Sequence, residues 1–238
     1  MAKKKIYVSP SDQINNKYAV GGTTEAVQCR KIAKALVSAL KRCDFDAMTN
    51  TTGNMQKRVA ESDKYGADLH LPIHTNAHNK KVKGTRLFSY DLKGEGYKAC
   101  KAIMAALAPI TPGSSDSITA RKTLYEIRKP KAPTAYIEVA FHDNTEEARW
   151  IVDNTDAIAE AICKGVCKHF AQKYVPPVTE QAPEQVEAPK AEKEDLIYRV
   201  FNSAGKQVGA YAEESNAFNE VKRQLQADGK ATITLGKK

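Results

Sequence analysis

Three residues that lie far apart in the sequence, Glu25, His74 and Glu138, have side chains that could together bind and use a metal ion. Histidine nitrogen and carboxylate oxygen are common zinc ligands, and a catalytic zinc keeps one position for water. A further carboxylate beside such a site can take a proton from that water and later pass it to a leaving amine. The reaction that suits these groups is hydrolysis of an amide bond.

Each of the three residues has a different local context. His74 ends an apolar segment, residues 68–74, which predicts a strand followed by a polar turn. Glu138 lies in residues 135–141, which are apolar on both faces, and burying an isolated carboxylate is costly unless it is paired, protonated or beside a metal. Glu25 lies in the first turn of a predicted helix, where an acid is also favoured by the helix dipole alone.

Strands and helices alternate along the part of the chain that must hold these residues. The strand-like segments are residues 5–9, 45–49, 68–74, 85–90 and 134–141. The helix-like segments are residues 24–41, 54–65, 96–107 and 146–170. This alternation predicts an α/β domain with a mixed, largely parallel sheet and helices on both faces.

A segment rich in proline, glutamate and alanine, residues 174–195, divides the chain. It cannot bury a core, and its prolines favour an extended linker between residues 1–173 and residues 196–238. The last part predicts a ββαβ module with strands at 196–201, 207–211 and 231–235 and a helix at 214–227. A module of this size is small for independent stability, so we expect it to pair with a second copy or to bind another surface.

The composition, with 42% hydrophobic and 27% charged residues, is typical of a soluble globular protein. No apolar run approaches the roughly 18 residues needed to span a bilayer, and the first residues lack the apolar part of a secretory signal. We therefore expect synthesis in the cytoplasm without a signal peptide, and no membrane insertion. The net charge of +9 favours a polyanionic partner such as nucleic acid or an anionic wall polymer.

The five cysteines are scattered, and their number is odd. Only Cys163 and Cys167 are close in sequence, at a helical spacing of four residues, and no second pair matches them. This pattern predicts free, buried thiols in a reducing compartment. The full set is Cys29, Cys43, Cys100, Cys163 and Cys167.

Four blocks of sequence resemble the amidase-3 family of zinc-dependent N-acetylmuramoyl-L-alanine amidases, especially endolysins of phages and prophages. The likeness covers residues 5–171. The blocks are Val8-Ser-Pro-Ser-Asp-Gln13, Gly22-Thr-Thr-Glu25, residues 68–77 (DLHLPIHTNA) and residues 131–144 (KAPTAYIEVAFHDN). All four follow one another in the family's order.

The resemblance implies that the chain cleaves the bond between N-acetylmuramic acid and L-alanine in peptidoglycan. It implies Zn²⁺ held by Glu25 and His74, with Glu138 as the general base. As a bacteriolytic enzyme, the protein would act on the cell wall after release through a holin. A basic nucleic-acid-binding protein would leave Glu138 unexplained, and no cluster of Lys and Arg with interleaved aromatics is present. We therefore expect no nucleic-acid partner.

One part of the family's pattern is absent, and it leaves the third zinc ligand open. The family has a Gly-His pair in the first block, where this chain has Ser11-Asp12. His142 and Asp12 are equal candidates for the third ligand. His70 ranks behind them, because in an extended strand it lies about 13 Å from His74. The alternative is a degraded metal site in a protein that binds peptidoglycan without cleaving it.

Several further side chains have two interpretations. Glu126 and Arg128 either line the cleft, where Arg128 would meet a substrate carboxylate, or form a surface ion pair. The last module weakly resembles the small wall-binding repeats of lysins, so we expect it to bind the cell wall or to form a homodimer. Its aromatic residues would either stack on sugars or form its core: Tyr198, Phe201, Tyr211 and Phe218.

Overall fold

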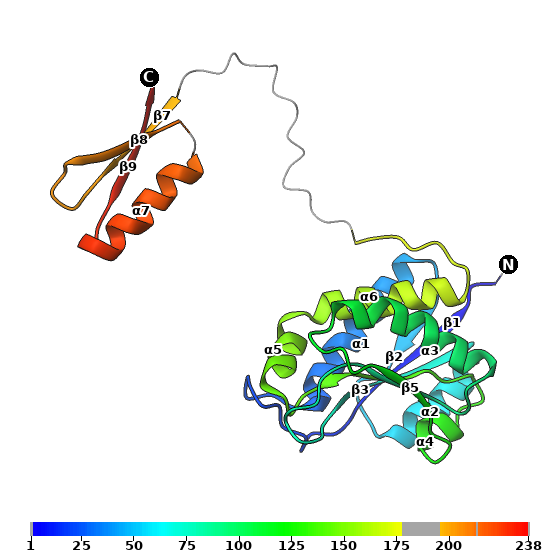
Figure 1. Cartoon of the computed structure of the whole chain (residues 1–238). Coiled ribbons are helices and arrows are strands. Elements are labelled where there is room, and N and C mark those ends of the chain that lie inside the picture. Colours follow the sequence, from blue (N-terminus) through cyan, green and yellow to red (C-terminus); the bar gives the residue numbers. More distant parts are fainter. Residues whose placement is uncertain (1, 178–195, 213, 238) are drawn as a thin grey trace. The chain divides into compact units, whose positions relative to one another are not determined.

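The computed structural model describes residues 2–177, 196–212 and 214–237 (Figure 1). The chain divides into two compact units at residue 177. Most of the predicted linker, residues 178–195, lies outside the described part of the chain. Within the described ranges, no helix is long and apolar enough to cross a membrane.

The first unit is built on a six-stranded sheet in the order β2-β1-β3-β6-β4-β5. Neighbouring strands are parallel except β4 and β6, which are antiparallel. This confirms the predicted mixed, largely parallel sheet. The strands are β1 (Lys5–Pro10), β2 (Asp46–Thr49), β3 (Leu69–Asn76), β4 (Arg86–Ser89), β5 (Ser117–Ala120) and β6 (Tyr136–Phe141).

Helices cover both faces of this sheet, as predicted. Helices α1, α3 and α6 pack together on one face, and α2 and α4 lie on the other (Figure 1). The bounds are α1 (Glu25–Arg42), α2 (Met55–Tyr65), α3 (Gly94–Leu107), the short 3₁₀ helix η1 (Ala108–Ile110), α4 (Tyr125–Arg128), α5 (Thr145–Asp153) and α6 (Thr155–His169).

The apolar periodicity of the sequence explains this layering. On α1 the buried residues recur at helical spacing and form one stripe against the sheet and α6. On β6, Ile137 and Val139 join that main core, whereas Tyr136 joins a smaller cluster with Phe88 and Ile127 on the other face. Because side chains alternate along a strand, Glu138 shares the face of Tyr136, the face that α4 covers.

The sequence did not predict β5 or α4, and it placed several ends a few residues away. Strand β5 is short and half-polar, and α4 is a single turn, so neither carries enough periodicity to be recognised. Strand β3 continues past His74 to Asn76, so the polar turn begins two residues later than predicted.

The second unit has the predicted ββαβ order. Strand β7 (Leu196–Phe201) lies between β8 (Gln207–Tyr211) and β9 (Thr232–Lys237), and both pairs are antiparallel. Helix α7 (Glu214–Asp228) packs on this sheet. The turn between β7 and β8 is held by the side chain of Asn202, which accepts hydrogen bonds from the N–H groups of Ala204 and Lys206.

Candidate functional site

His74 and Glu138 lie side by side on the neighbouring parallel strands β3 and β6, with His74 near the carboxyl end of β3 and Glu138 in the middle of β6. They are direct partners in the register of β3 and β6. Glu25, the first residue of α1, comes to the same place from the helix N-terminus, and its Oε1 lies 2.8 Å from Nδ1 of His74. The structure therefore brings together the three residues that the sequence singled out. Carboxyl ends of parallel strands are where α/β proteins commonly bind ligands.

Carboxylates lie on both sides of the His74 ring. Nδ1 faces Glu25, and Nε2 lies 3.4 Å from Oε2 of Glu126, which α4 supplies. One face of the ring stacks on Tyr136, with the ring centroids 4.6 Å apart. His74, Glu25 and Glu126 are all buried. The imidazole is therefore fixed in position by three different elements of the fold.

These contacts shift the titration of the paired groups. Burial alone would lower the pKa of His74, but Glu126 and Glu25 outweigh it and raise that pKa to about 10. Burial alone would raise the pKa of Glu126, but contacts with His70 and His74 lower it to about 2. Without a metal, His74 is thus an imidazolium held between carboxylates.

Glu138 is the carboxylate of this group without a hydrogen-bond partner. Its Oε2 is a buried atom for which no partner exists among the described residues. Burial, opposed by His74 and reinforced by the charge of Glu25, raises the pKa of Glu138 to about 7. A buried acceptor left free in this way is rare in native proteins and points to a ligand, an ion or a proton-transfer role.

The loop before α1 holds Glu25. Asn16 donates from Nδ2 to Oε2 of Glu25 at 2.7 Å, and its backbone carbonyl accepts the N–H of Glu25. Thr24 is the N-cap residue, but its side chain makes no capping hydrogen bond. Glu25 therefore points into the site instead of serving as a plain helix-capping acid.

The candidates for a third ligand point in different directions. Asp12 turns toward α2, where Oδ2 accepts the N–H of Met55 at 3.1 Å and lies 3.5 Å from Arg58. His142 stacks on Tyr18, and its Nδ1 lies 3.0 Å from the carbonyl oxygen of Thr75, the residue after His74. Neither candidate forms a group of three donors within 4.8 Å with Glu25 and His74 in the described structure.

The side chain of Gln13, in the first block, contacts both Glu25 and His74. Its Nε2 lies 3.4 Å from both Oε1 of Glu25 and Nδ1 of His74. The sequence pointed to Asp12 because that residue aligns with the family's ligand. Strand β1 ends at Pro10, and the chain beyond it turns so that Gln13 takes the inner position.

Glu126 has a larger role at this site than the sequence indicated. It is 1% exposed, so it does not form a surface ion pair, whereas Arg128 is exposed. Glu126 also contacts Ser9, and its Oε1 lies 3.5 Å from Nε2 of His70. His70 and His74 thus both reach one carboxylate despite their four-residue separation along β3. The signal available in the sequence was an acid flanked by apolar residues in Leu124-Tyr-Glu-Ile.

The charges and donors of this site fit a divalent cation. The buried carboxylates of Glu25 and Glu126 lie on either side of one imidazole, and the partly buried Glu138 lies beside it with an Oε2 atom that lacks a hydrogen-bond partner among the described residues. Carboxylate oxygen and imidazole nitrogen are the donor set that zinc accepts at catalytic sites. Glu25 makes the shorter of the two carboxylate contacts with His74, 2.8 Å against 3.4 Å for Glu126, so Glu25 and His74 are the pair that would hold such an ion.

Comparison with known proteins supports one family throughout the first unit. The family described as N-acetylmuramoyl-L-alanine amidase (Amidase_3) matches residues 8–168. The germination-specific N-acetylmuramoyl-L-alanine amidase of Bacillus subtilis is 28% identical over 154 residues, which cover 60% of this chain and 65% of the relative. The chain spans between 51% and 65% of the length of the curated relatives it matches.

Solved structures share the fold at low sequence identity. The amidase AmiC2 of Nostoc punctiforme superposes with a TM-score of 0.62 and 20% identity, over 71% of this chain and 98% of that one. The catalytic domain of the CD27L endolysin, which targets Clostridia Difficile, gives 0.60 and 19% identity, over 69% and 97%. With the family match over more than half of its residues, the chain belongs to the Amidase_3 family of N-acetylmuramoyl-L-alanine amidases.

Proposed function

We propose that this chain hydrolyses the amide bond between N-acetylmuramic acid and L-alanine in peptidoglycan and that it does so with one bound Zn²⁺. Family membership supports the substrate and the bond. The observation that carries the chemistry is the register pair of His74 and Glu138, with the unpartnered Oε2 atom of Glu138 beside the Glu25–His74 contact.

Glu25 and His74 hold the zinc in this proposal. Binding requires His74 to lose the proton that its two carboxylate neighbours stabilise, so metal uptake releases a proton. When bound, zinc supplies Lewis acidity at the scissile carbonyl. Glu126 remains hydrogen-bonded to Nε2 of His74, and this contact keeps the imidazole ring oriented on β3.

Glu138 is the general base. It takes a proton from the attacking water and returns it to the amide nitrogen as the bond to L-alanine breaks. Its position on β6 is fixed by the sheet, one strand away from His74. A carboxylate with a pKa raised to about 7 can both accept and donate a proton near neutral pH, which suits this double task.

His142 is our choice for the third ligand, with Asp12 as the alternative. The Nδ1 atom of His142 is held at 3.0 Å from the carbonyl oxygen of Thr75, which leaves Nε2 as the nitrogen available to a metal. Ligand histidines usually donate their other ring N–H to a carbonyl or carboxylate in this way. Asp12 is already engaged by the Met55 N–H and by Arg58.

The test is release of stem peptides from purified cell walls. The wild-type chain with zinc should generate new α-amino groups on L-alanine without new reducing sugar ends, and Glu138→Gln should not. A non-catalytic wall-binding protein, the alternative function, would sediment with walls, release nothing and bind no zinc at Glu25 and His74. Release of reducing ends instead of alanine amino groups would assign a different bond and overturn the proposal.

We further propose a lytic role of the endolysin kind. One solved neighbour is the catalytic domain of an endolysin, whereas a curated relative is a germination-specific amidase. Lysis of intact vegetative cells by added protein supports the first role, and activity confined to spore-derived walls supports the second. The second unit would bind the wall in either case and raise the local concentration of the enzyme on its insoluble substrate.

A further inference from the structure

Three of the five cysteines converge although the sequence pairs only two of them. Cys163 and Cys167 lie one turn apart on α6, and Cys43 follows the last residue of α1. The three Sγ atoms all lie within 4.8 Å of one another, and all three residues are buried. We propose that Cys43, Cys163 and Cys167 form a second metal site, for a thiophilic divalent ion such as Zn²⁺.

The sulfur positions suit a metal with little rearrangement. In a tetrahedral zinc site with Zn–S bonds of about 2.3 Å, two sulfurs are about 3.8 Å apart. Sγ of Cys43 lies 3.7 Å from Sγ of Cys163. The separations that involve Cys167 need shorten by no more than about 1 Å to reach the same value.

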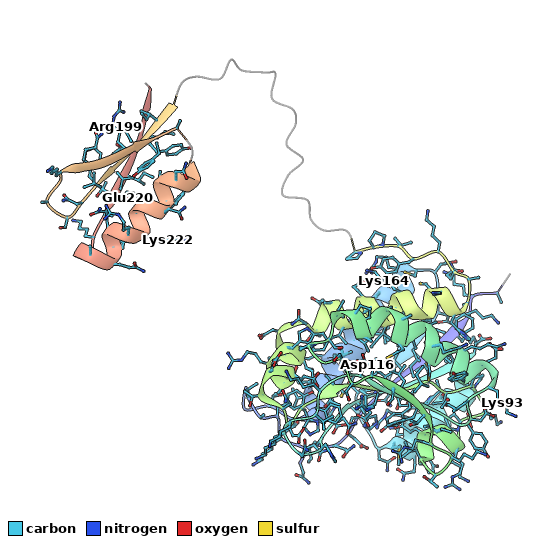
Figure 2. All side chains as sticks on the ribbon, viewed as in Figure 1. Lys93, Asp116, Lys164, Arg199, Glu220 and Lys222 are labelled. Atoms are coloured by element: carbon cyan, nitrogen blue, oxygen red, sulfur yellow. The ribbon has the colours of Figure 1, made fainter. Side chains whose placement is uncertain are left out.

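The elements that carry the thiols are rigid. The helical spacing of four residues places both α6 sulfurs on one face, and that face packs against α1. Lys164, labelled on α6 in Figure 2, lies on the exposed side of the same helix. The N–H of Cys43 bonds to the carbonyls of Ala39 and Leu40, which fixes the residue at the end of α1. The site therefore needs no flexible loop to form.

A backbone N–H and a guanidinium group lie beside Cys43. The N–H of Val175 donates to Sγ of Cys43 at 3.2 Å. Arg42, the preceding residue, donates to the carbonyl of Val175 and to Glu160, so a guanidinium lies beside the cluster. A backbone N–H and a nearby cation are the features that stabilise thiolates.

The cluster is separate from the candidate amidase site. Glu25 begins α1 and Cys43 follows its end, and a helix of 18 residues is about 27 Å long. The two sites cannot share an ion. A metal at the thiols would join the end of α1 to α6. Residues 174–175, near the end of the first unit, pack beside this place through hydrogen bonds to Glu160 and Cys43. The effect of the metal is therefore on stability. Each thiol that binds gives its proton to the solvent, so one ion displaces up to three protons.

Cys29 and Cys100 provide matched controls. Both are fully buried, but neither belongs to the cluster, and Cys100 Sγ donates to the carbonyl of Phe88. If buried thiols were here only as small apolar side chains, all five cysteines would respond alike to substitution and to metal.

The test uses the full chain, reduced and stripped of metal, titrated with Cd²⁺ while ultraviolet absorption from thiolate-to-metal charge transfer is followed. We expect one equivalent to saturate the band, with release of protons to the buffer. Cys43→Ala and Cys163→Ala should lose the band, and Cys29→Ala and Cys100→Ala should keep it. His74→Ala should also keep it, because the amidase site contains no sulfur.

A second readout guards against variants that fold poorly. In a His74→Ala background, Cd²⁺ should raise the melting temperature of the chain with five cysteines and leave that of Cys43→Ala unchanged. The proposal is overturned if the reduced wild type shows no charge-transfer band, or if the band survives Cys163→Ala. Loss of two thiols on air oxidation, together with no band in the reduced protein, would identify a disulfide pair and overturn it as well.

Discussion

His74 and Glu138 are Cα partners on adjacent parallel strands, so the proposed metal ligand and the proposed base are positioned by the sheet itself. Neighbouring strands lie about 4.8 Å apart, and partner side chains project from the same face. Helix α1 supplies Glu25, which Asn16 of the preceding loop holds, and the covering helix α4 supplies Glu126. Because the sheet holds these residues, an isosteric substitution such as Glu138→Gln can remove the chemical function of a side chain and leave the fold intact.

Glu138→Gln is the sharpest test of the base. The substitution keeps the size of the side chain and removes its ability to accept the proton of water, so the rate of peptide release should fall by about 10²–10⁴-fold. Zinc content and melting temperature should stay at wild-type values. Glu146→Gln, an exposed acid paired with Lys83, is the control and should keep full activity. Activity within a few-fold of wild type in Glu138→Gln would exclude the general-base role.

The third ligand can be identified from zinc affinity, measured by competition with a chelator. The measurements belong in a Cys43→Ala background, which removes the proposed thiolate site. Loss of a residue that only hydrogen-bonds to a metal ligand typically weakens metal binding by roughly 10–100-fold. His142→Ala should weaken zinc binding by more than this, whereas Asp12→Ala should have a smaller effect. His78→Ala, an exposed histidine nearby in sequence, is the control. The reverse order would assign the metal to Asp12.

The sequence was sufficient for the fold and for the proximity of Glu25, His74 and Glu138, because each of these residues lies in a strongly patterned element. The apolar strand around Glu138 made its carboxylate conspicuous, and α1 and β3 have clear periodicity. The first block was harder to interpret, because the direction of the chain after Pro10 decides whether Asp12 or Gln13 faces Glu25 and His74, and periodicity does not reach into that loop. The role of Glu126 was underestimated because a helix of a single turn, α4, leaves no apolar periodicity in the sequence.

The convergence of three thiols was likewise outside the reach of sequence spacing. The expectation of free, buried cysteines is confirmed. The sequence showed no second cysteine pair to match Cys163 and Cys167, but packing of α1 on α6 brings the single residue Cys43 to them across 120 residues. Such long-range juxtaposition depends on the order of strands in the sheet and on which face each helix covers.

Glu126→Ala should destabilise the first unit strongly. The residue is buried and lies against His74, His70 and Ser9, so its removal leaves His74 with one carboxylate fewer and a cavity beside Tyr136. Removing one partner of a buried ion pair costs about 3–5 kcal/mol. Urea denaturation of zinc-free protein should show a loss of that order, and Glu146→Ala should stay within the ~0–1 kcal/mol typical of surface pairs. Equal stability of the two variants would contradict the buried network.

Asp68 gives a prediction for the dependence of stability on pH. Its carboxylate accepts the N–H of Lys5 at 2.8 Å and the ammonium of Lys4 at 2.9 Å, which joins the start of β3 to β1. Burial alone would raise the pKa of Asp68, but these contacts outweigh it and lower the pKa below its ordinary value of 3.8. The stabilisation is therefore present above pH 3.8 and is lost as pH falls through the lower folded value.

Comparison of wild type with Asp68→Ala by urea denaturation would check this dependence. The wild type should be more stable by about 1 kcal/mol at neutral pH, the size of a typical hydrogen bond. The difference should shrink below pH 3.8. Asp44→Asn removes the charge of the exposed pair with Lys3 and suits the left-handed backbone at this position, so it should show little difference at any pH. A difference between wild type and Asp68→Ala that grows on acidification would reverse the sign and contradict the assignment.

The second unit exposes two apolar side chains on one face of α7, and we propose that it binds the wall through them. Phe218 and Leu225 on α7 are 49% and 46% exposed, and seven residues of separation place them on one face of the helix. The other aromatics of this unit are partly buried in its sheet, so Phe218 is the one available for stacking on a sugar. In the full chain, Phe218→Ser should weaken sedimentation with walls by about tenfold, which corresponds to about 1.4 kcal/mol.

The same Phe218→Ser chain should release peptide from soluble wall fragments at the wild-type rate, because its substitution lies in the other unit. Tyr90→Ser removes an equally exposed aromatic residue, 51% exposed, from the first unit and is the matched control for sedimentation. If Tyr90→Ser weakens sedimentation and Phe218→Ser does not, the wall contact belongs to the first unit. If Phe218→Ser changes only the concentration at which the chain self-associates, the surface pairs two copies of the module instead.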